Sequence, residues 1–335
     1  MAGPYLQSDC SIGIKKELAF GTAVTVDQHL EFNSETLQKD IQFLQGNGFR
    51  AGSASERFNR RYAGKIDISG DIVCDADSVT LATLLEAAFG TVATGGVTAP
   101  FGRLFSPAMG DNPPSYTIQK GIPLVGGTDV KAHTFTGAVC GQMQINAAND
   151  AIVEVTTSWV GKDMSTAAPL VTPAYPAASN VFHFHKGSIA IGGTATIPTA
   201  TSPSTGATPV ADVRDCQITL NNNFDGNGWN FGGAGSRNRA PAYGRREVTG
   251  QLTAEFDAVT LRDASLAGTG LALVLDFTAG ANERLQIVLP KIGFESNVPN
   301  SNGGDVITQQ FNFKAYEDAG NLAAYVLLQN AVAIV

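Results

Sequence analysis

The chain has 335 residues, a net charge of −8 and a charged fraction of only 16%. A protein that reads DNA needs a basic surface to neutralise phosphates, and the densest basic cluster here is one short run, residues 57–65. The composition therefore argues against sequence-specific binding of nucleic acid. The abundance of Gly, Ala, Thr, Ser and Asn instead favours β-structure with many turns.

The sequence has no apolar stretch typical of membrane insertion or export. The N-terminal residues lack the apolar core of a signal peptide, and no run of about 18 apolar residues occurs. We expect free thiols in a protein made in the cytoplasm, because the cysteines are far apart and form no CxxC motif. The four cysteines are Cys10, Cys74, Cys140 and Cys216.

In the first half of the chain, a strand predicted over residues 29–40 leads through a Gly-rich loop (QGNGFRAGSAS, 45–55) to a second strand, 64–77. The side chains of this second strand alternate with period 2, so one face enters the core and the other is polar and acidic. The acidic positions on that polar face are Asp67, Asp71 and Asp75.

A short helix is predicted over residues 77–90, with Asp77 or Ser78 as its N-cap and Gly90 as its end. An insertion (91–114) and a β-hairpin (135–163) follow. The Pro-, Ala- and Thr-rich tract 163–180 is typical of a linker, and a second such tract, 195–210, is predicted to be an exposed loop.

No motif in the sequence predicts a cofactor, a metal site or enzymatic activity. His183 and His185 would face the same way on a strand and could supply two metal ligands, but no Cys, Asp or Glu lies close by in sequence. The Gly-rich loops lack the following Lys-Ser/Thr of a phosphate-binding loop, and neither βαβ units nor a GxSxG motif is present. We therefore expect packed or solvated histidines.

The second half of the chain repeats the first. A strand (214–224), a Gly-rich loop (DGNGWNFGGAG, 225–235) and an alternating strand (245–257) with Glu247 and Glu255 on its polar face recur. Residues 45–81 align without gaps to 225–261 with 12 of 37 positions identical, whereas chance gives about two or three. The hairpin 135–163 likewise resembles 288–318.

These patterns predict a mainly β fold of two tandem duplicated β-sandwich units, each with a short helix. We place the first unit at residues 1–170, and the linker with the second unit at 171–335.

The order of these segments resembles the tail tube proteins of long, non-contractile-tailed bacteriophages. The resemblance covers most of the chain and rests on the segments IGIKKELAFGTAVTVDQHLEFNSETLQKD, RYAGKIDISGDIVCDAD, LLEAAFGTV, YTIQKGIP and FTGAVCGQMQINAANDAIVEVTTSWVGKDMST, and on ITLNNNFDGNG, REVTGQLTAEFDA and LQIVLPKIGFES in the second half. It implies a structural protein of the virion tail, made and assembled in the host cytoplasm, whose rings stack into a hollow tube.

In that family a sheet from each fold unit joins its neighbours into a closed, β-lined lumen, and closure removes exposed edge strands. The expected partners are other copies of the chain, the tape-measure protein, and the tail-tip and tail-terminator proteins, while DNA passes through the lumen without specific binding. Because many members carry one unit and form six-fold rings, two units per chain predict a trimeric ring with pseudo-six-fold symmetry. A hexamer of two-unit chains is the alternative.

The resemblance gives the polar strand faces and the Gly-rich loops an expected role. Carboxylates lining a narrow lumen would repel DNA over about a Debye length, roughly 8 Å; the other interpretation is an ordinary solvated face. The residues expected to face the lumen are Asp67, Asp71, Asp75, Glu247 and Glu255. Residues 41–62 and 224–245 are expected to stack one ring on the next, through Phe49, Arg57, Trp229, Phe231 and Arg237.

Two other functions remain open from the sequence alone. A secreted or surface β-sandwich binding module would need an export signal, which we do not find. A tube protein of a related secretion or contractile machine shares the same features and is harder to exclude.

Overall fold

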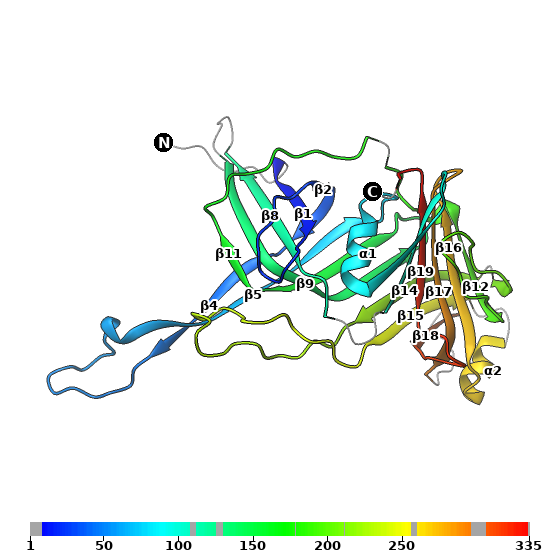
Figure 1. Cartoon of the computed structure of the whole chain (residues 1–335). Helices are drawn as coiled ribbons and strands as arrows, with labels where there is room; N and C mark the ends of the chain where they lie inside the picture. Colours follow the sequence, from blue (N-terminus) through cyan, green and yellow to red (C-terminus); the bar gives the residue numbers. More distant parts are fainter. Residues whose placement is uncertain are drawn as a thin grey trace.

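The computed structural model describes residues 9–107, 112–124, 130–177, 179–210, 212–255, 260–295 and 306–333. Within these residues the fold is mainly β, with antiparallel strand pairs throughout and two short α-helices (Figure 1). The strands of the first half are β1 (Ser11–Lys16), β2 (Gln28–Leu30), β3 (Phe32–Glu35), β4 (Gln38–Gln45), β5 (Arg61–Asp75), β6 (Gly90–Gly95), β7 (Phe101–Pro107), β8 (Tyr116–Pro123), β9 (Val130–Ala148), β10 (Glu154–Gly161) and β11 (Asp163–Ser165). Those of the second half are β12 (Gly187–Gly193), β13 (Ala207–Val210), β14 (Val213–Asn221), β15 (Glu247–Glu255), β16 (Leu271–Thr278), β17 (Arg284–Phe294), β18 (Thr308–Ala315) and β19 (Tyr325–Asn330).

One sheet runs through both halves of the chain. Its strands pair in the order β4–β5–β10–β9–β14–β15–β18–β17. The two halves join where β9 pairs with β14, in a register that places Gln217 opposite Asn146 and Asn221 opposite Gln142. We refer to these eight strands as the long sheet.

Each half also carries a second layer of strands, which diverges from the long sheet. The first half of β9 leaves the long sheet to pair with β8 and β11, giving the order β2–β1–β8–β9–β11. In the same way β17 pairs with β16 and β19, giving β13–β12–β16–β17–β19. The predicted insertion, 91–114, contributes the hairpin β6–β7, and β7 extends the second of these layers by pairing with β19.

The predicted helix is confirmed as α1 (Leu81–Phe89), but its N-cap is Thr80 and not Asp77 or Ser78. The Asp77 carboxylate accepts hydrogen bonds from the backbone N–H groups of Val79 and Thr80, each at 2.7 Å, so Asp77 fixes the turn that leads into the helix. Gly90 ends it in a left-handed conformation, with φ of 81°. The helix lies between the two layers of strands (Figure 1), with Leu81, Leu84 and Leu85 buried; α2 (Thr260–Ala267) is its counterpart in chain order.

Two glycines of the long sheet lie opposite large aromatic residues on the neighbouring strands. Gly70 on β5 lies opposite Trp159 on β10, and Gly250 on β15 lies opposite Phe313 on β18. A Cβ atom at Gly250 would lie 2.4 Å from Cζ of Phe313 and 2.3 Å from the carbonyl oxygen of Gln217. Both aromatic residues are buried, so close packing excludes any larger residue at this position.

Two further details of the sequence-based expectations are wrong. His183 and His185 do not share a strand face, because residues 184–186 form a 3₁₀ helix and His183 makes only an isolated bridge to Ile152. The tract 195–210 is only partly exposed: Ala195 and Ile197 pack against the core of the second half, where their apolar side chains are removed from water.

Candidate functional site

The long sheet has one apolar face that packs into the core and one polar face that does not. On β5 the predicted alternation is confirmed: Ile68 and Ile72 are buried, while Asp71 is exposed and the remaining acidic positions are half-buried. On β15 the same holds, with Val248 and Leu252 buried beneath. All five acidic residues that the sequence singled out therefore lie on one face of one sheet: Asp67, Asp71, Asp75, Glu247 and Glu255.

Neutral polar residues fill the middle of this face. At the junction of the two halves, amide and hydroxyl side chains align across β9, β14 and β15, since Gln144 lies opposite Thr219 and Thr219 opposite Thr249. The polar face, as we use the term, comprises Asp67, Ser69, Asp71, Asp75, Gln142, Gln144, Asn146, Glu154, Thr156, Ser158, Asp215, Gln217, Thr219, Asn221, Glu247, Thr249, Gln251, Thr253, Glu255, Thr308, Gln310, Asn312 and Lys314.

Glu247 and Glu255, the two carboxylates that β15 places on the polar face, are paired with cations. Nζ of Lys314 lies 2.6 Å from Oε1 of Glu247, and this hydrogen bond holds the pKa of the Glu247 carboxyl below its usual value. Nη2 of Arg214 lies 2.6 Å from Oε1 of Glu255. The sequence pattern missed both cations, because they come from neighbouring strands that only the fold brings together.

The carboxylates of the first half carry most of the unpaired charge. Asp71 and Asp75 form no ion pair with any residue that the structure describes; Asp75 accepts one hydrogen bond, from Nδ2 of Asn33 at 2.8 Å. Glu154 on β10 lies directly opposite Asp75 and adds a further carboxylate that the sequence did not single out. The negative charge of the polar face is therefore concentrated on β5 and β10.

The loop between β4 and β5 forms a hairpin that projects from the body of the molecule (Figure 1). We call residues 46–58 the hairpin tip. Phe49 is fully exposed there and Phe58 is 84% exposed. Arg57 is half-buried, and its Nη2 atom has no hydrogen-bond partner among the described residues. A hairpin with this much apolar surface is typical of a segment that another protein covers.

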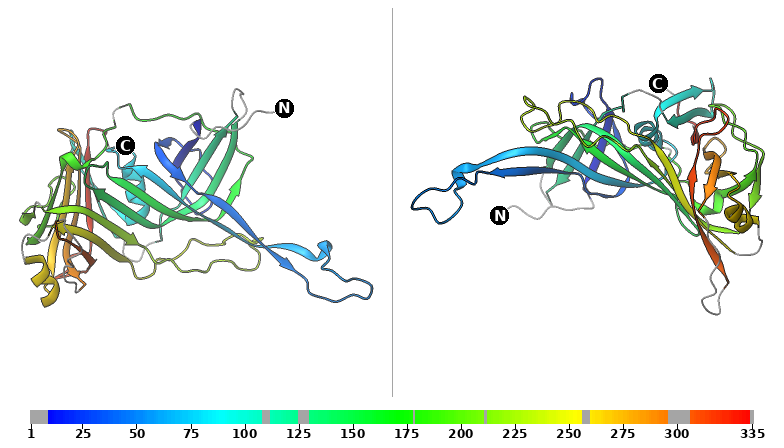
Figure 2. Two further views of the ribbon diagram at one scale, coloured as in Figure 1. Left: turned by 180° about the vertical axis from the view of Figure 1, so that it is seen from behind. Right: turned by 90° about the horizontal axis from the view of Figure 1, so that it is seen from below.

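The corresponding loop between β14 and β15 instead folds back onto β5 (Figure 2). We call residues 224–245 the return loop. Nε1 of Trp229 donates a hydrogen bond to the carbonyl oxygen of Ile66 at 2.8 Å, and the N–H of Ile66 donates to the carbonyl oxygen of Gly235 at 2.8 Å. The Trp229 ring lies between two cations, with Nζ of Lys65 at 3.5 Å and Cζ of Arg237 at 3.8 Å from its centroid.

The return loop has an inner face and an outer face. Arg237 is buried on the inner face: its Nη1 donates to the carbonyl oxygen of Asn227 at 2.7 Å, and its Nη2 lies 3.9 Å from a carboxylate oxygen of Asp67. Burial lowers the pKa of this guanidinium and outweighs the opposing effect of Asp67. Phe231 is fully exposed on the outer face, so its ring is free to contact another molecule.

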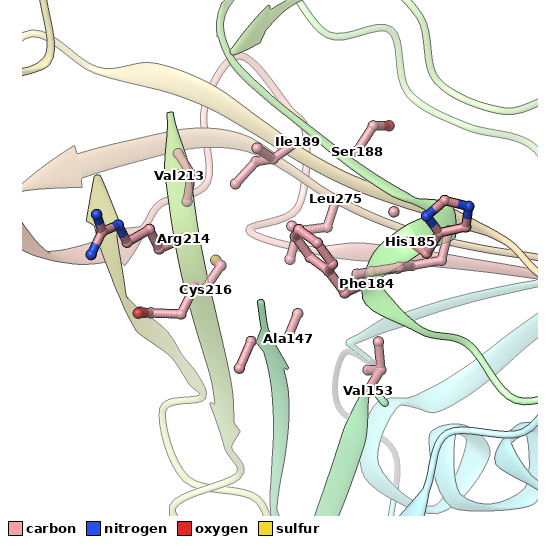
Figure 3. A pocket seen from close by; sticks show the side chains of 14 residues that line it. Ala147, Val153, Phe184, His185, Ser188, Ile189, Val213, Arg214, Cys216 and Leu275 are labelled. Carbon is pink, nitrogen blue, oxygen red and sulfur yellow. The ribbon is translucent and has the colours of Figure 1, made fainter. Parts of the chain in front are cut away.

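A crevice of about 360 Å³ lies between the two halves, but its lining offers no catalytic arrangement (Figure 3). Its walls are mainly apolar, with Phe184, Leu275 and Phe277 among them. Burial raises the pKa of the Cys216 thiol that faces it, which disfavours the nucleophilic thiolate. Among the described residues no group of His, Cys, Asp and Glu side chains is arranged to hold a metal ion.

Comparisons with known proteins identify the family of the chain. No curated protein sequence matches the chain. None of the helices within the described ranges is long and apolar enough to span a membrane. A family model described as phage tail tube protein matches residues 7–315, which is most of the chain. The chain therefore belongs to the phage tail tube protein family, whose members are non-enzymatic structural components of the virion tail that assemble into a tube.

Proposed function

We propose that the chain is a tandem duplication of one tail tube unit. Matching elements follow one another in both halves, so that β5, α1, β8, β9 and β10 correspond to β15, α2, β16, β17 and β18. The strand pairs Gly70–Trp159 and Gly250–Phe313 occupy matching positions in the two halves. One set of strand pairings used twice, in register with the sequence repeat, supports this proposal.

Three such chains form one ring of the tube, which gives six units per ring. The long sheet already joins two units side by side through β9 and β14. Repeating that junction between chains closes a barrel and removes its exposed edges. A ring of six chains, with the second unit as an outer decoration, is the competing arrangement.

The polar face lines the lumen of this tube, which conducts DNA into the host and holds the tape-measure protein during assembly. The observation that carries this proposal is the continuity of the polar face across the junction of the two halves, since a decoration domain would not extend the same surface. The unpaired carboxylates Asp71 and Asp75 repel the phosphate backbone, while the neutral amides of the junction offer no fixed charge to hold it. Tail-tip and tail-terminator proteins cap the two ends.

Contacts between rings involve the outer face of the return loop. Phe231 supports this role, because its side chain is fully exposed at the end of a loop that is otherwise tied to its own chain. Trp229 and Arg237 set the position of the loop from its inner face.

Labelling of single cysteines tests the lumen. In a Cys10→Ser background, a Thr249→Cys variant in assembled tubes is expected to react with a small maleimide but not with a maleimide on a bulky polymer. A Val97→Cys variant, on the exposed β6–β7 turn, is the matched control and is expected to react with both. Equal reaction of Thr249→Cys with both reagents would place the polar face outside the tube and refute the proposal.

A further inference from the structure

The return loop lies beside the part of β5 that extends beyond the end of β10. The last pair between β5 and β10 is Ile68 with Gly161, so Ile66 lies two residues beyond the end of β10. No strand pairs with the backbone of Ile66 on the β10 side of β5. There the return loop supplies the partners: the N–H of Ile66 donates to the carbonyl oxygen of Gly235, and Nε1 of Trp229 donates to the carbonyl oxygen of Ile66. The return loop thus completes the edge that β10 leaves open.

The same place exists in the second half, and no loop of the described chain fills it. The last pair between β15 and β18 is Val248 with Ala315, so Arg246 lies two residues beyond the end of β18. A groove of about 670 Å³ is found there. Its lining includes Gly244, Arg245, Arg246, Val248, Ala315 and Tyr316.

The hairpin tip carries the residues that would occupy this groove. With the offset of the sequence repeat, Phe49 corresponds to Trp229, and Arg57 corresponds to Arg237. The receiving residues correspond as well: Arg245 replaces Lys65 as the cation above the ring, and Glu247 replaces Asp67 as the carboxylate. Every charged residue in the contact between the return loop and β5 therefore has a counterpart of the same sign in a contact between the hairpin tip and the groove beside Arg246.

The hairpin tip does not reach the groove of its own chain. It projects from the β4 edge of the long sheet, away from β18 and β17 at the other edge (Figures 1 and 2). In the hairpin tip the Phe49 ring is fully exposed, and the Nη2 atom of Arg57 has no hydrogen-bond partner among the described residues. Both features are expected of a segment that binds another chain.

We propose that the hairpin tip of one chain docks in the groove beside Arg246 of the next chain in the same ring, in the way the return loop docks on Ile66. In this contact Phe49 lies between the Arg245 and Arg57 guanidinium groups, and Arg57 faces the carboxylate of Glu247. The inference rests on the proposed duplication and ring. It divides the two loops by role, since the return loop links units within a chain and the hairpin tip links chains within a ring.

Covalent cross-linking tests this contact. In a Cys10→Ser background, the Phe49→Cys/Arg245→Cys variant is assembled and treated with a short bis-maleimide, and its products are separated under denaturing conditions. Most of the chain is expected to shift to products of two and three chains, ending at three because the ring closes. The matched control, Trp229→Cys/Lys65→Cys, is expected to cross-link within one chain without an increase in mass. If the first pair fails to fold, Arg57→Cys/Glu247→Cys gives the same readout.

Two results would overturn the inference while leaving the tube intact. A ladder that continues beyond one ring would show that the hairpin tip contacts the ring above or below. Absence of products larger than one chain, from tubes that look normal by electron microscopy, would show that it docks elsewhere. Failure of the unmodified chain to form rings or tubes would instead refute the proposed function, and this inference with it.

Discussion

Substitution of Trp229 is expected to release the return loop from β5. The Trp229→Ala change removes one hydrogen bond, worth about 1 kcal/mol, and two cation–π contacts, worth about 0.5–1 kcal/mol each. These are the bond to Ile66 at 2.8 Å and the contacts with Lys65 and Arg237. The docked loop therefore loses about 2–3 kcal/mol, and its open population rises by about 30- to 150-fold, at tenfold per 1.4 kcal/mol.

Limited proteolysis of the unassembled chain measures this population, because cleavage of a locally opened segment follows its equilibrium with the closed form. Trypsin can cleave after Arg239, which is exposed in the return loop. The Trp229→Ala variant should be cleaved there about 30- to 150-fold faster than the unmodified chain. Trp229→Phe keeps the ring and loses only the hydrogen bond, so an increase of about fivefold is expected.

The matched control is Phe231→Ala, which changes a fully exposed aromatic residue in the same loop. Its cleavage rate should equal that of the unmodified chain. If Trp229→Ala is cleaved no faster than Phe231→Ala, the return loop is not held by the contacts described, and the template for the contact between chains is lost.

Three further predictions concern charge, thiols and pH. Tubes of an Asp71→Lys/Asp75→Lys variant should retain short duplex DNA in a sedimentation assay at physiological salt. Unmodified tubes and tubes of the Asp71→Asn/Asp75→Asn control should not retain it. Equal retention by all three would contradict the electrostatic role of the polar face. In the unassembled native chain a thiol reagent should modify the half-buried Cys10 before the three buried cysteines, which should react only after denaturation. Modification of all four cysteines at the same rate would contradict their burial. The hydrogen bond from Arg239 lowers the pKa of Asp225 below its ordinary value of 3.8. The Asp225 carboxylate therefore stabilises the return loop above that pH, and this stabilisation is lost as the pH falls through the pKa of the folded state. Cleavage of the return loop by an acid-active protease should rise on acidification, and Asp225→Asn should abolish that rise.

Features that depend on local periodicity could be predicted from the sequence. The alternation on β5 and β15 follows from period 2, and α1 follows from the spacing of its leucines and the stop at Gly90. The glycines at matching positions, Gly70 and Gly250, could be aligned from sequence, but only the structure shows that each faces a large aromatic residue.

Features that depend on distant partners could not be predicted. The two Gly-rich loops look alike in sequence, yet one projects and the other docks, because only the return loop finds an unpaired strand edge in its own chain. The ion pairs of Glu247 and Glu255 with Lys314 and Arg214 join residues far apart in sequence. Trp229 carried one usable signal, since a buried indole N–H needs an acceptor.

The most direct test of the account is the mass of a single ring, measured on rings released from tubes and supported by end-on averages of intact tubes. The account predicts three chains of 34.9 kDa per ring and a lumen with six similar units around it. Six chains per ring, with twelve units, would contradict the trimeric ring and leave the second unit as an outer decoration.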